Sequence, residues 1–435
     1  MKRLLLTISF FLYFSTSNAD QLNWLDSNPS HTCLILENAY FTMQTRDEGE
    51  EWQSDIIRLY KGDIIPKHRH KETLNDFWYI TTDGSPFKLG NFDQYDRVLW
   101  KDDIKKTEKK LMECTPYFSK SVKIEFETYN VFTQNDLSNG FDDNEKQIGF
   151  GILHYPNKKK CKNLKQFPVM FLIHHSGGDI VQTYKYALHN ECVATFEPMI
   201  FQSRGHNENY YDTDRDIVWV TETQGAVDAL VSLDVISNLP DINKDKIGIM
   251  GWSYGGIVAL ETQNMFNIKK VKPKNKFSLH LSYYPYCYHY EDNTTTDAIM
   301  AMFLGTKDYL PYTICQEYYD GLADKTNKFM YVYKNALHNF DGGPEVLSGA
   351  TLVSPECRIH TDLKGNESIR PNDKEKWFDL TSNGGWFGSK GDPSLLKLSM
   401  ELCWKYDRAF QGRNQLAFED SFDKFTKYIN ILKND

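Results

Sequence analysis

The sequence predicts an α/β fold with a mostly parallel central sheet and helices on both faces. Two observations support it. From residue 122 onward, short apolar runs alternate with longer segments of helical periodicity, and a glycine-flanked serine stands directly behind one of these runs. Such alternation is typical of parallel sheets built from β–α–β units. With 435 residues, 40% of them hydrophobic, the chain is large enough for one α/β unit with additions.

The first residues match a secretory signal peptide. A positive start at Met1 to Arg3 precedes a short apolar stretch and then small residues up to Ala19, after which we expect cleavage. The alternative is a short anchor helix, but the apolar stretch is well below the ~20 residues that span a bilayer. We therefore expect residues 1–19 to be removed and the mature chain to be exported, periplasmic or secreted, with no membrane contact. Residues 20–118 are an N-terminal extension of unknown structure.

The elements of the main domain, expected over 119–435, follow in order. Eight apolar runs are expected to be strands: residues 123–128, 147–154, 169–174, 193–196, 247–250, 279–283, 301–304 and 330–333. Helices are expected over 221–238, 256–266 and 418–432, where apolar residues recur at helical spacing. A long stretch at about 344–402, rich in Gly, Ser, Asp and aromatic residues, is expected to be an insertion.

The most telling motif is the hexapeptide Gly-Trp-Ser-Tyr-Gly-Gly at 251–256, directly behind the strand expected at 247–250. A serine between a strand and a helix, with small residues on either side, has the pattern of a nucleophile elbow. The tight turn strains the serine backbone and exposes its hydroxyl beside a helix N-terminus, where negative charge is favoured. Ser253 is therefore a candidate nucleophile. The alternative is a glycine-rich turn with an incidental serine.

A serine nucleophile needs a base and an acid that orients the base. Asp308 follows the strand expected at 301–304, and His338 follows the strand expected at 330–333, so the order is serine, acid, histidine. We predict that these two residues complete a triad with Ser253. Competing acids and bases remain: Asp320, Asp341, His289 and His360.

Acyl transfer also needs amide donors for a developing oxyanion. The glycine-rich turn His-His-Ser-Gly-Gly at 174–178 follows the strand expected at 169–174. We place the oxyanion between the backbone amides of Tyr254 and Ser176. The alternative is a turn that only reverses the chain. Because neighbouring residues on an extended chain point in opposite directions, His174 and His175 are not expected to share a metal ion.

Composition excludes several other classes of function. The net charge of −9 and the pI near 5.8 argue against a nucleic-acid partner or an anionic membrane surface. None of the eight cysteines has zinc-type C-x-x-C spacing, so no metal and no cofactor are expected. An even number of cysteines in an exported chain suggests disulfides.

Together these motifs resemble the dienelactone hydrolase family of α/β-hydrolases, in its serine-nucleophile branch. The resemblance covers about residues 122–341 and includes the elbow and four further motifs: His174 to Gly178, Tyr284 to Cys287, Gly305 to Asp308 and His338 to Asp341. It implies the α/β-hydrolase fold and the triad. The chain departs from the family at two positions. Ser253 stands where dienelactone hydrolases proper have cysteine, so lactone hydrolysis is not carried over, and His175 stands where the oxyanion turn normally has glycine.

Further expectations concern the surroundings of this site. Cys287 and Cys315 follow neighbouring strand ends and are expected to pair, with two buried thiols as the alternative. We also expect Cys357 to pair with Cys403 and Cys33 with Cys114. The insertion begins directly after the base loop, so it is expected to be a lid or a substrate wall, with a peripheral ornament as the alternative. The candidate substrate contacts are His175, Trp252, Trp377, Trp386 and Phe387.

The sequence therefore predicts an exported serine hydrolase that cleaves carboxylic esters of small molecules through an acyl-enzyme. One alternative is a serine peptidase resembling prolyl oligopeptidase relatives, although the extension of about 100 residues is too short for their propeller. Another is a non-catalytic binding protein on the same fold. The physiological substrate and the oligomeric state are not indicated by the sequence.

Overall fold

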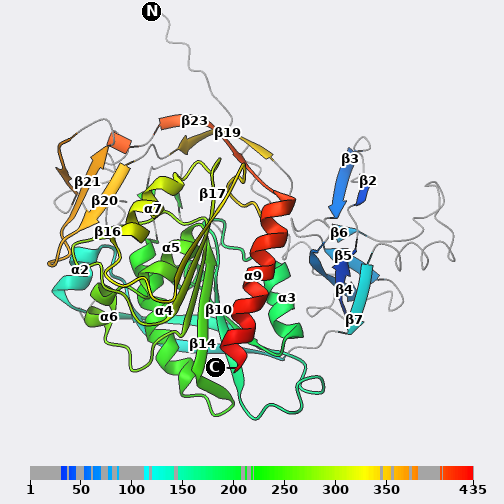
Figure 1. Cartoon of the computed structure of the whole chain (residues 1–435). Coiled ribbons are helices and arrows are strands. Elements are labelled where there is room, and N and C mark those ends of the chain that lie inside the picture. The colour runs from blue at the N-terminus through cyan, green and yellow to red at the C-terminus, as the bar shows by residue number, and fades with distance from the viewer. Residues whose placement is uncertain are drawn as a thin grey trace, which may run out of the picture.

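A large central sheet of eight strands organises the molecule (Figure 1). The computed structural model describes residues 31–36, 39–45, 53–59, 62–69, 77–80, 86–87, 112–116, 120–141, 146–206, 211–212, 217–218, 220–342, 346–353, 357–371, 375–380, 402–403 and 405–434. The eight strands are β8 (Lys120–Tyr129), β9 (Lys146–Tyr155), β10 (Phe167–Ile173), β11 (Ala194–Pro198), β14 (Ile242–Trp252), β15 (Leu279–Tyr283), β17 (Ile299–Gly305) and β18 (Lys328–Tyr333). Each overlaps one of the eight apolar runs predicted to be strands.

The strand order is β18-β17-β15-β14-β10-β11-β9-β8. Each pair of neighbouring strands is parallel along the part of the sheet with the order β18-β17-β15-β14-β10-β11. Strand β9 is antiparallel to both of its neighbours, β8 and β11. With helices on both faces, this is the α/β-hydrolase fold, as the sequence predicted. Because β10 pairs with β14, the turn after β10 and the turn after β14 lie side by side at the carboxyl edge of the sheet.

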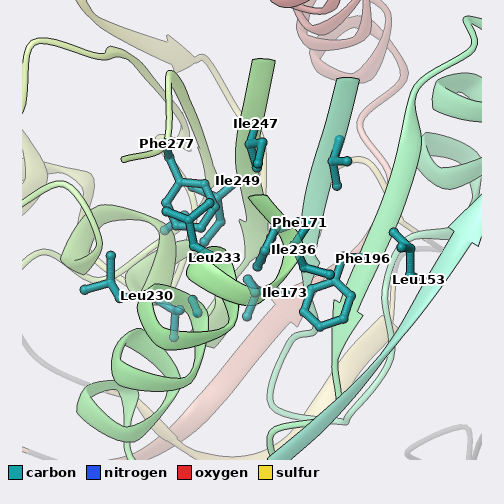
Figure 2. Packing of buried hydrophobic residues seen from close by; sticks show 14 of the residues in the cluster. Leu153, Phe171, Ile173, Phe196, Leu230, Leu233, Ile236, Ile247, Ile249 and Phe277 are labelled. Carbon is teal, nitrogen blue, oxygen red and sulfur yellow. The ribbon is translucent and has the colours of Figure 1, made fainter. Parts of the chain in front are cut away.

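Alternating residues of the sheet build two cores, one on each face. On β10, Val169, Phe171 and Ile173 belong to the core beneath α4 (Glu222–Ser237) and α5 (Tyr254–Glu261), part of which Figure 2 shows. Met170 and Leu172 point to the opposite core, beneath α3 (Gln182–Asn190) and α9 (Gln415–Asn434). A strand buried on both faces has no polar alternation, which explains the continuous apolar run.

The remaining helices complete the two layers. They are α2 (Gln134–Asn139), the short 3₁₀ helix η2 (Gln202–Arg204), α6 (Met265–Val271) and α7 (Tyr312–Gly321). The single helix expected over 256–266 is two helices, because Asn264 caps a new helix by accepting a hydrogen bond from the Phe266 amide at 2.8 Å. The helix expected over 418–432 is longer at both ends and forms α9.

The N-terminal region contains a separate antiparallel sheet of order β6-β5-β4-β1-β7, beside α3 in Figure 1. Its strands are β1 (His31–Ile35), β4 (Ile64–Arg69), β5 (Phe77–Ile80), β6 (Pro86–Phe87) and β7 (Met112–Pro116). A further pair, β2 (Ala39–Thr45) with β3 (Gln53–Leu59), forms a hairpin. The small sheet contacts the main domain where the Ile64 amide donates to Thr183 Oγ1 at 3.3 Å. The predicted signal peptide, residues 1–19, lies outside the described residues.

The stretch predicted to be an insertion supplies strands to two small sheets. β20 (Cys357–Thr361), β21 (Glu367–Pro371) and β22 (Phe378–Asp379) extend β16 (His289–Tyr290), and β19 (Val346–Val353) pairs with β23 (Lys405–Gln411). A third small sheet joins β12 (Tyr211–Asp212) to β13 (Ile217–Val218).

Four disulfides cross-link the chain: Cys33–Cys114, Cys161–Cys192, Cys287–Cys315 and Cys357–Cys403. The three pairings predicted from the sequence are among them. Four disulfides are typical of proteins from an oxidising compartment. Within the described part of the chain, no helix is both long and apolar enough to cross a membrane.

Candidate active site

Ser253 stands at the turn between β14 and α5 in a strained backbone conformation. Its φ of 53° and ψ of −115° lie in a region that residues with a side chain rarely adopt. Its amide donates to Tyr283 O at 2.9 Å, and its carbonyl accepts from the Ile257 amide at 3.0 Å. These hydrogen bonds hold the strained residue between a neighbouring strand and the helix that it precedes. This geometry agrees with the elbow predicted from the hexapeptide.

The glycines on either side of Ser253 are required by close backbone approach. A Cβ on Gly251 would lie 2.2 Å from Gly255 O, and a Cβ on Gly255 would lie 2.2 Å from Ile173 O. Contacts this short are with backbone, which cannot move aside as a side chain could. Only glycine therefore allows α5 to pack this closely on β14 and β10.

The structure brings the three predicted residues of the triad into one hydrogen-bonded chain. His338 Nε2 lies 3.0 Å from Ser253 Oγ, and His338 Nδ1 lies 3.0 Å from each carboxylate oxygen of Asp308. A carboxylate only accepts hydrogen bonds, so Nδ1 carries the proton and Nε2 is the acceptor that faces the serine hydroxyl. The arrangement leaves the histidine able to remove the proton of Ser253.

Two tyrosine rings hold the imidazole of His338. Tyr284 packs against it edge-to-face at 4.7 Å between ring centroids, and Tyr309 packs at 4.4 Å. The side chains of His338 and Asp308 are 4% and 2% exposed, respectively. Water is thus largely excluded from the histidine–aspartate hydrogen bonds, which strengthens them. The sequence analysis named Tyr284 only as part of a motif, and it did not predict a role for Tyr309. The position of Tyr309, an aromatic residue directly after the candidate acid Asp308, could have indicated that role.

Asp341, one of the competing acids, lies beneath the site and orients structural groups instead of the histidine. It accepts hydrogen bonds from the Tyr284 hydroxyl at 2.8 Å and from Trp252 Nε1 at 3.1 Å. Burial raises the pKa of Asp341, and hydrogen bonds from Tyr284, Tyr184 and Trp252, followed by the charge of Arg413, oppose that shift. The carboxyl group therefore fastens the ring of Tyr284 that packs on His338.

The loop that carries His338 is fastened to the segment after β23. His338 O accepts from the Gly412 amide at 2.8 Å, and Phe340 O accepts from the Asn414 amide at 2.9 Å. Arg413, which lies between Gly412 and Asn414 in the sequence, donates to Asp341 O at 3.0 Å and to Asp63 Oδ1 at 2.7 Å. The buried ion pair with Asp63 connects the N-terminal sheet to the base loop, a connection that sequence analysis missed because the two residues are 350 positions apart.

The predicted oxyanion turn follows β10 and is closed by its own hydrogen bonds. The Gly178 amide donates to His175 O at 2.9 Å, and the His175 amide donates to Asp179 O at 3.0 Å. The ring of His174 is buried and stacks parallel to the ring of Tyr254, with the two centroids 5.6 Å apart. The Ser176 amide has no hydrogen-bond partner among the described residues. The turn is thus fixed beside the elbow, with this amide available to a ligand.

The structure places two of the aromatic residues predicted to contact substrate away from that role, and two others lie outside the described residues. Trp252 is fully buried, with its indole N–H on Asp341, so the prediction that it contacts substrate is wrong. Trp377 packs against Arg370 and His360 within the β16-β20-β21-β22 sheet. Trp386 and Phe387 lie outside the described residues.

The competing residues are placed elsewhere by the structure. His289 and His360 are directly paired in that same sheet, on β16 and β20, and Asp320 is exposed near the end of α7. Among the described residues, none of the three makes a hydrogen bond or ring contact with Ser253 or His338. Within the described ranges, no three His, Cys, Asp or Glu side chains are arranged to hold a metal ion.

The sheet order, the elbow and the serine–histidine–aspartate chain define a protein of the α/β-hydrolase fold. No protein-family model matches the sequence, and no curated protein matches it. Among solved structures it is similar to a dienelactone hydrolase-like promiscuous phosphotriesterase from metagenomic libraries, at 12% identity and a TM-score of 0.34, over 51% of this chain and 84% of that chain.

Two further structures are similar to the same extent. One is a candidate dienelactone hydrolase from Klebsiella pneumoniae, at 14% identity and a TM-score of 0.35, over 51% of this chain and 89% of that chain. The other is an esterase from the planctomycete Thermogutta terrifontis, at 12% identity and a TM-score of 0.34, over 45% of this chain and 81% of that chain.

Proposed function

We propose that this protein is an exported serine hydrolase that cleaves carboxylic ester bonds of small molecules. The observation that carries the proposal is the strained Ser253, whose hydroxyl lies 3.0 Å from His338 Nε2 while Asp308 holds the other ring nitrogen. A structural serine has no need of a strained backbone and a buried histidine–aspartate pair. The five sequence motifs that resemble dienelactone hydrolases support the same reaction class.

In the proposed mechanism, His338 Nε2 takes the proton of Ser253 as the hydroxyl oxygen attacks the ester carbonyl carbon. Electrons of the carbonyl bond move to its oxygen, which the backbone amides of Tyr254 and Ser176 stabilise. His338 then gives the proton to the leaving alcohol, and water repeats the sequence to release the acid. General-base assistance of this kind contributes about 10²–10⁴-fold, and one oxyanion donor about 3 kcal/mol.

Asp308 is proposed to keep His338 in the tautomer that accepts at Nε2 and to stabilise the imidazolium that forms. Tyr284 and Tyr309 hold the ring in place. We also propose export, which the four disulfides support. The mechanism requires no metal and no cofactor.

The test is active-site labelling with a fluorophosphonate, which reacts only with an activated serine. We expect the wild type to be labelled and the Ser253→Ala variant to remain unlabelled, with its hydrolysis of p-nitrophenyl esters reduced by at least about 10⁴-fold. Ser278 offers a matched control, because Ser278→Ala removes a serine that directly precedes β15 and whose hydroxyl donates to the Ile247 carbonyl. An unlabelled wild type would favour the non-catalytic binding protein, and labelling that survives Ser253→Ala would exclude this nucleophile.

A substrate panel separates esterase from peptidase, since both use the same three residues. We expect turnover of p-nitrophenyl esters and none of peptide anilides. Faster cleavage of the anilides would instead support the alternative that resembles prolyl oligopeptidase relatives.

A further inference from the structure

His175 is the one side chain in the oxyanion turn whose position the family pattern reserves for glycine. Its ring folds back over the turn, and its Nδ1 accepts a hydrogen bond from the Gly177 amide at 2.9 Å. A Cβ on Gly177 would lie 2.7 Å from His175 Cε1, so position 177 must be glycine for the ring to fit. The imidazole is therefore held in one orientation against the turn.

The hydrogen bond from Gly177 also fixes the protonation of the ring. Since Nδ1 accepts, a neutral imidazole carries its proton on Nε2. The pKa of His175 is lowered to about 4, mainly by burial and also by the charges of His174 and His338. All the charged groups that act on His175 are basic, so no partner favours the imidazolium. The ring is neutral at the pH where His338 would work, with an N–H at Nε2.

This N–H has no hydrogen-bond partner in the described part of the chain. Nε2 of His175 makes no hydrogen bond to any described residue, although the side chain is partly buried. The turn that carries this ring packs directly on the elbow, because a Cβ on Gly255 would lie 2.2 Å from Ile173 O and 2.6 Å from His174 O. The neighbouring Ser176 amide is also without a partner in the described chain. Two unused donors from consecutive residues thus lie beside the elbow.

We propose that the Nε2–H of His175 is a third donor of the oxyanion hole, binding the carbonyl oxygen of the ester as it becomes negative. This inference rests on the proposed function. As Ser253 Oγ bonds to the carbonyl carbon, the π electrons move to oxygen, which accepts from two amides and this imidazole. His175 neither gives nor takes a proton; it remains neutral throughout, as a polarising group must.

The alternative role for His175 is structural, namely to close the turn through Nδ1. Two substitutions separate the roles, because each amide side chain reproduces one ring nitrogen. In His175→Asn, the short side chain can accept from Gly177 but does not reach the site. In His175→Gln, the longer side chain places an N–H near the position of Nε2. His175→Ala removes both.

The experiment measures kcat and KM on p-nitrophenyl esters for the three variants. We expect His175→Ala and His175→Asn to lose about 10- to 100-fold in kcat with KM within about twofold, because the donor acts on charge that develops in the transition state. His175→Gln is expected to recover much of that loss. Melting temperature, measured in parallel, reports whether the turn is intact.

A kcat for His175→Gln that does not exceed that of His175→Asn would overturn the inference, as would unchanged kcat in His175→Ala. Labelling at saturating fluorophosphonate distinguishes this failure from failure of the proposed function. If Ser253 is labelled to completion in all three variants but their kcat values do not follow this order, the nucleophile stands and the third donor does not.

Discussion

Buried acidic side chains occur in two regions of this molecule, and their neighbours differ. At the carboxyl edge of the sheet, Asp308 faces the imidazole of His338, and Asp341 lies near the guanidinium of Arg413. At the second region, which we name the carboxyl joint, Glu222 of α4, Glu261 of α5 and Glu367 of β21 lie near one another. The joint connects the main domain to the inserted strands.

At the carboxyl joint, the charges that raise the pKa values of Glu222 and Glu367 belong to other acids. The pKa is raised to about 8 for Glu222, to about 7 for Glu261 and to about 8 for Glu367. Burial is the largest cause in each case, and the charge of Glu261 contributes to the shifts of Glu222 and Glu367. Glu261 accepts from the Asn267 side chain at 2.8 Å and from the Tyr290 hydroxyl. Burial is alike in the two regions. The regions differ in what the acids meet: Asp308 lies on a ring nitrogen of His338, whereas the acids of the carboxyl joint lie near one another, which adds to the effect of burial on the pKa values of Glu222 and Glu367.

The largest expected effect tests the role of Asp308. We expect Asp308→Asn to lower kcat by about 10⁴-fold, because the amide stabilises the wrong tautomer of His338 and cannot stabilise its positive form. Steady-state ester hydrolysis measures this. The matched control is Asp320→Asn, which changes an exposed acid near the end of α7 and should leave kcat unchanged. Equal losses in both variants would refute the assignment of Asp308.

A smaller effect, on the free energy of unfolding, is expected when Asp341, the second acid at the carboxyl edge of the sheet, is replaced. Asp341→Ala leaves Trp252 Nε1 and the Tyr284 hydroxyl without their buried acceptor, so the free energy of unfolding should fall by roughly 3–5 kcal/mol. Urea unfolding measures it, with Asp320→Ala as the exposed control. A loss below 1 kcal/mol would mean that Asp341 does not fasten the base loop.

The smallest expected effect comes from the carboxyl joint and depends on pH. The folded pKa values are raised above the ordinary 4.5 of glutamate, so the fold favours the protonated acids. Their contribution to stability is complete below about pH 4.5 and is lost as pH rises through about 7 to 8. In Glu261→Gln, which cannot ionise, this loss should shrink by about 1–3 kcal/mol.

Unfolding midpoints between pH 5 and pH 9 report this difference. Glu419→Gln, an exposed substitution on α9, is the control and should keep the slope of the wild type. If the unfolding midpoint of Glu261→Gln changes with pH in the same way as that of the wild type, Glu261 does not titrate between pH 5 and pH 9. The proposed difference between the acids of the two regions would then be wrong.

Local sequence determined much of the fold and of the candidate site. Each of the eight strands followed from a short apolar run, and the elbow followed from the glycines that its backbone contacts demand. Asp308 and His338 were found because each comes just past a strand of a parallel sheet, and the carboxyl ends of such strands meet at one edge. These features depend on residues that are near one another in the chain, or on a rule of topology.

Only the tertiary structure decided which side chains meet across long separations. It buried Trp252 on Asp341 instead of exposing it to substrate, and it placed Tyr309 on His338. It also joined Asp63 to Arg413 and collected the three glutamates of the carboxyl joint from three different elements. Such contacts depend on how helices and inserted strands pack on the sheet. The periodicity of a sequence encodes which face of an element is buried, but not which partner it meets there.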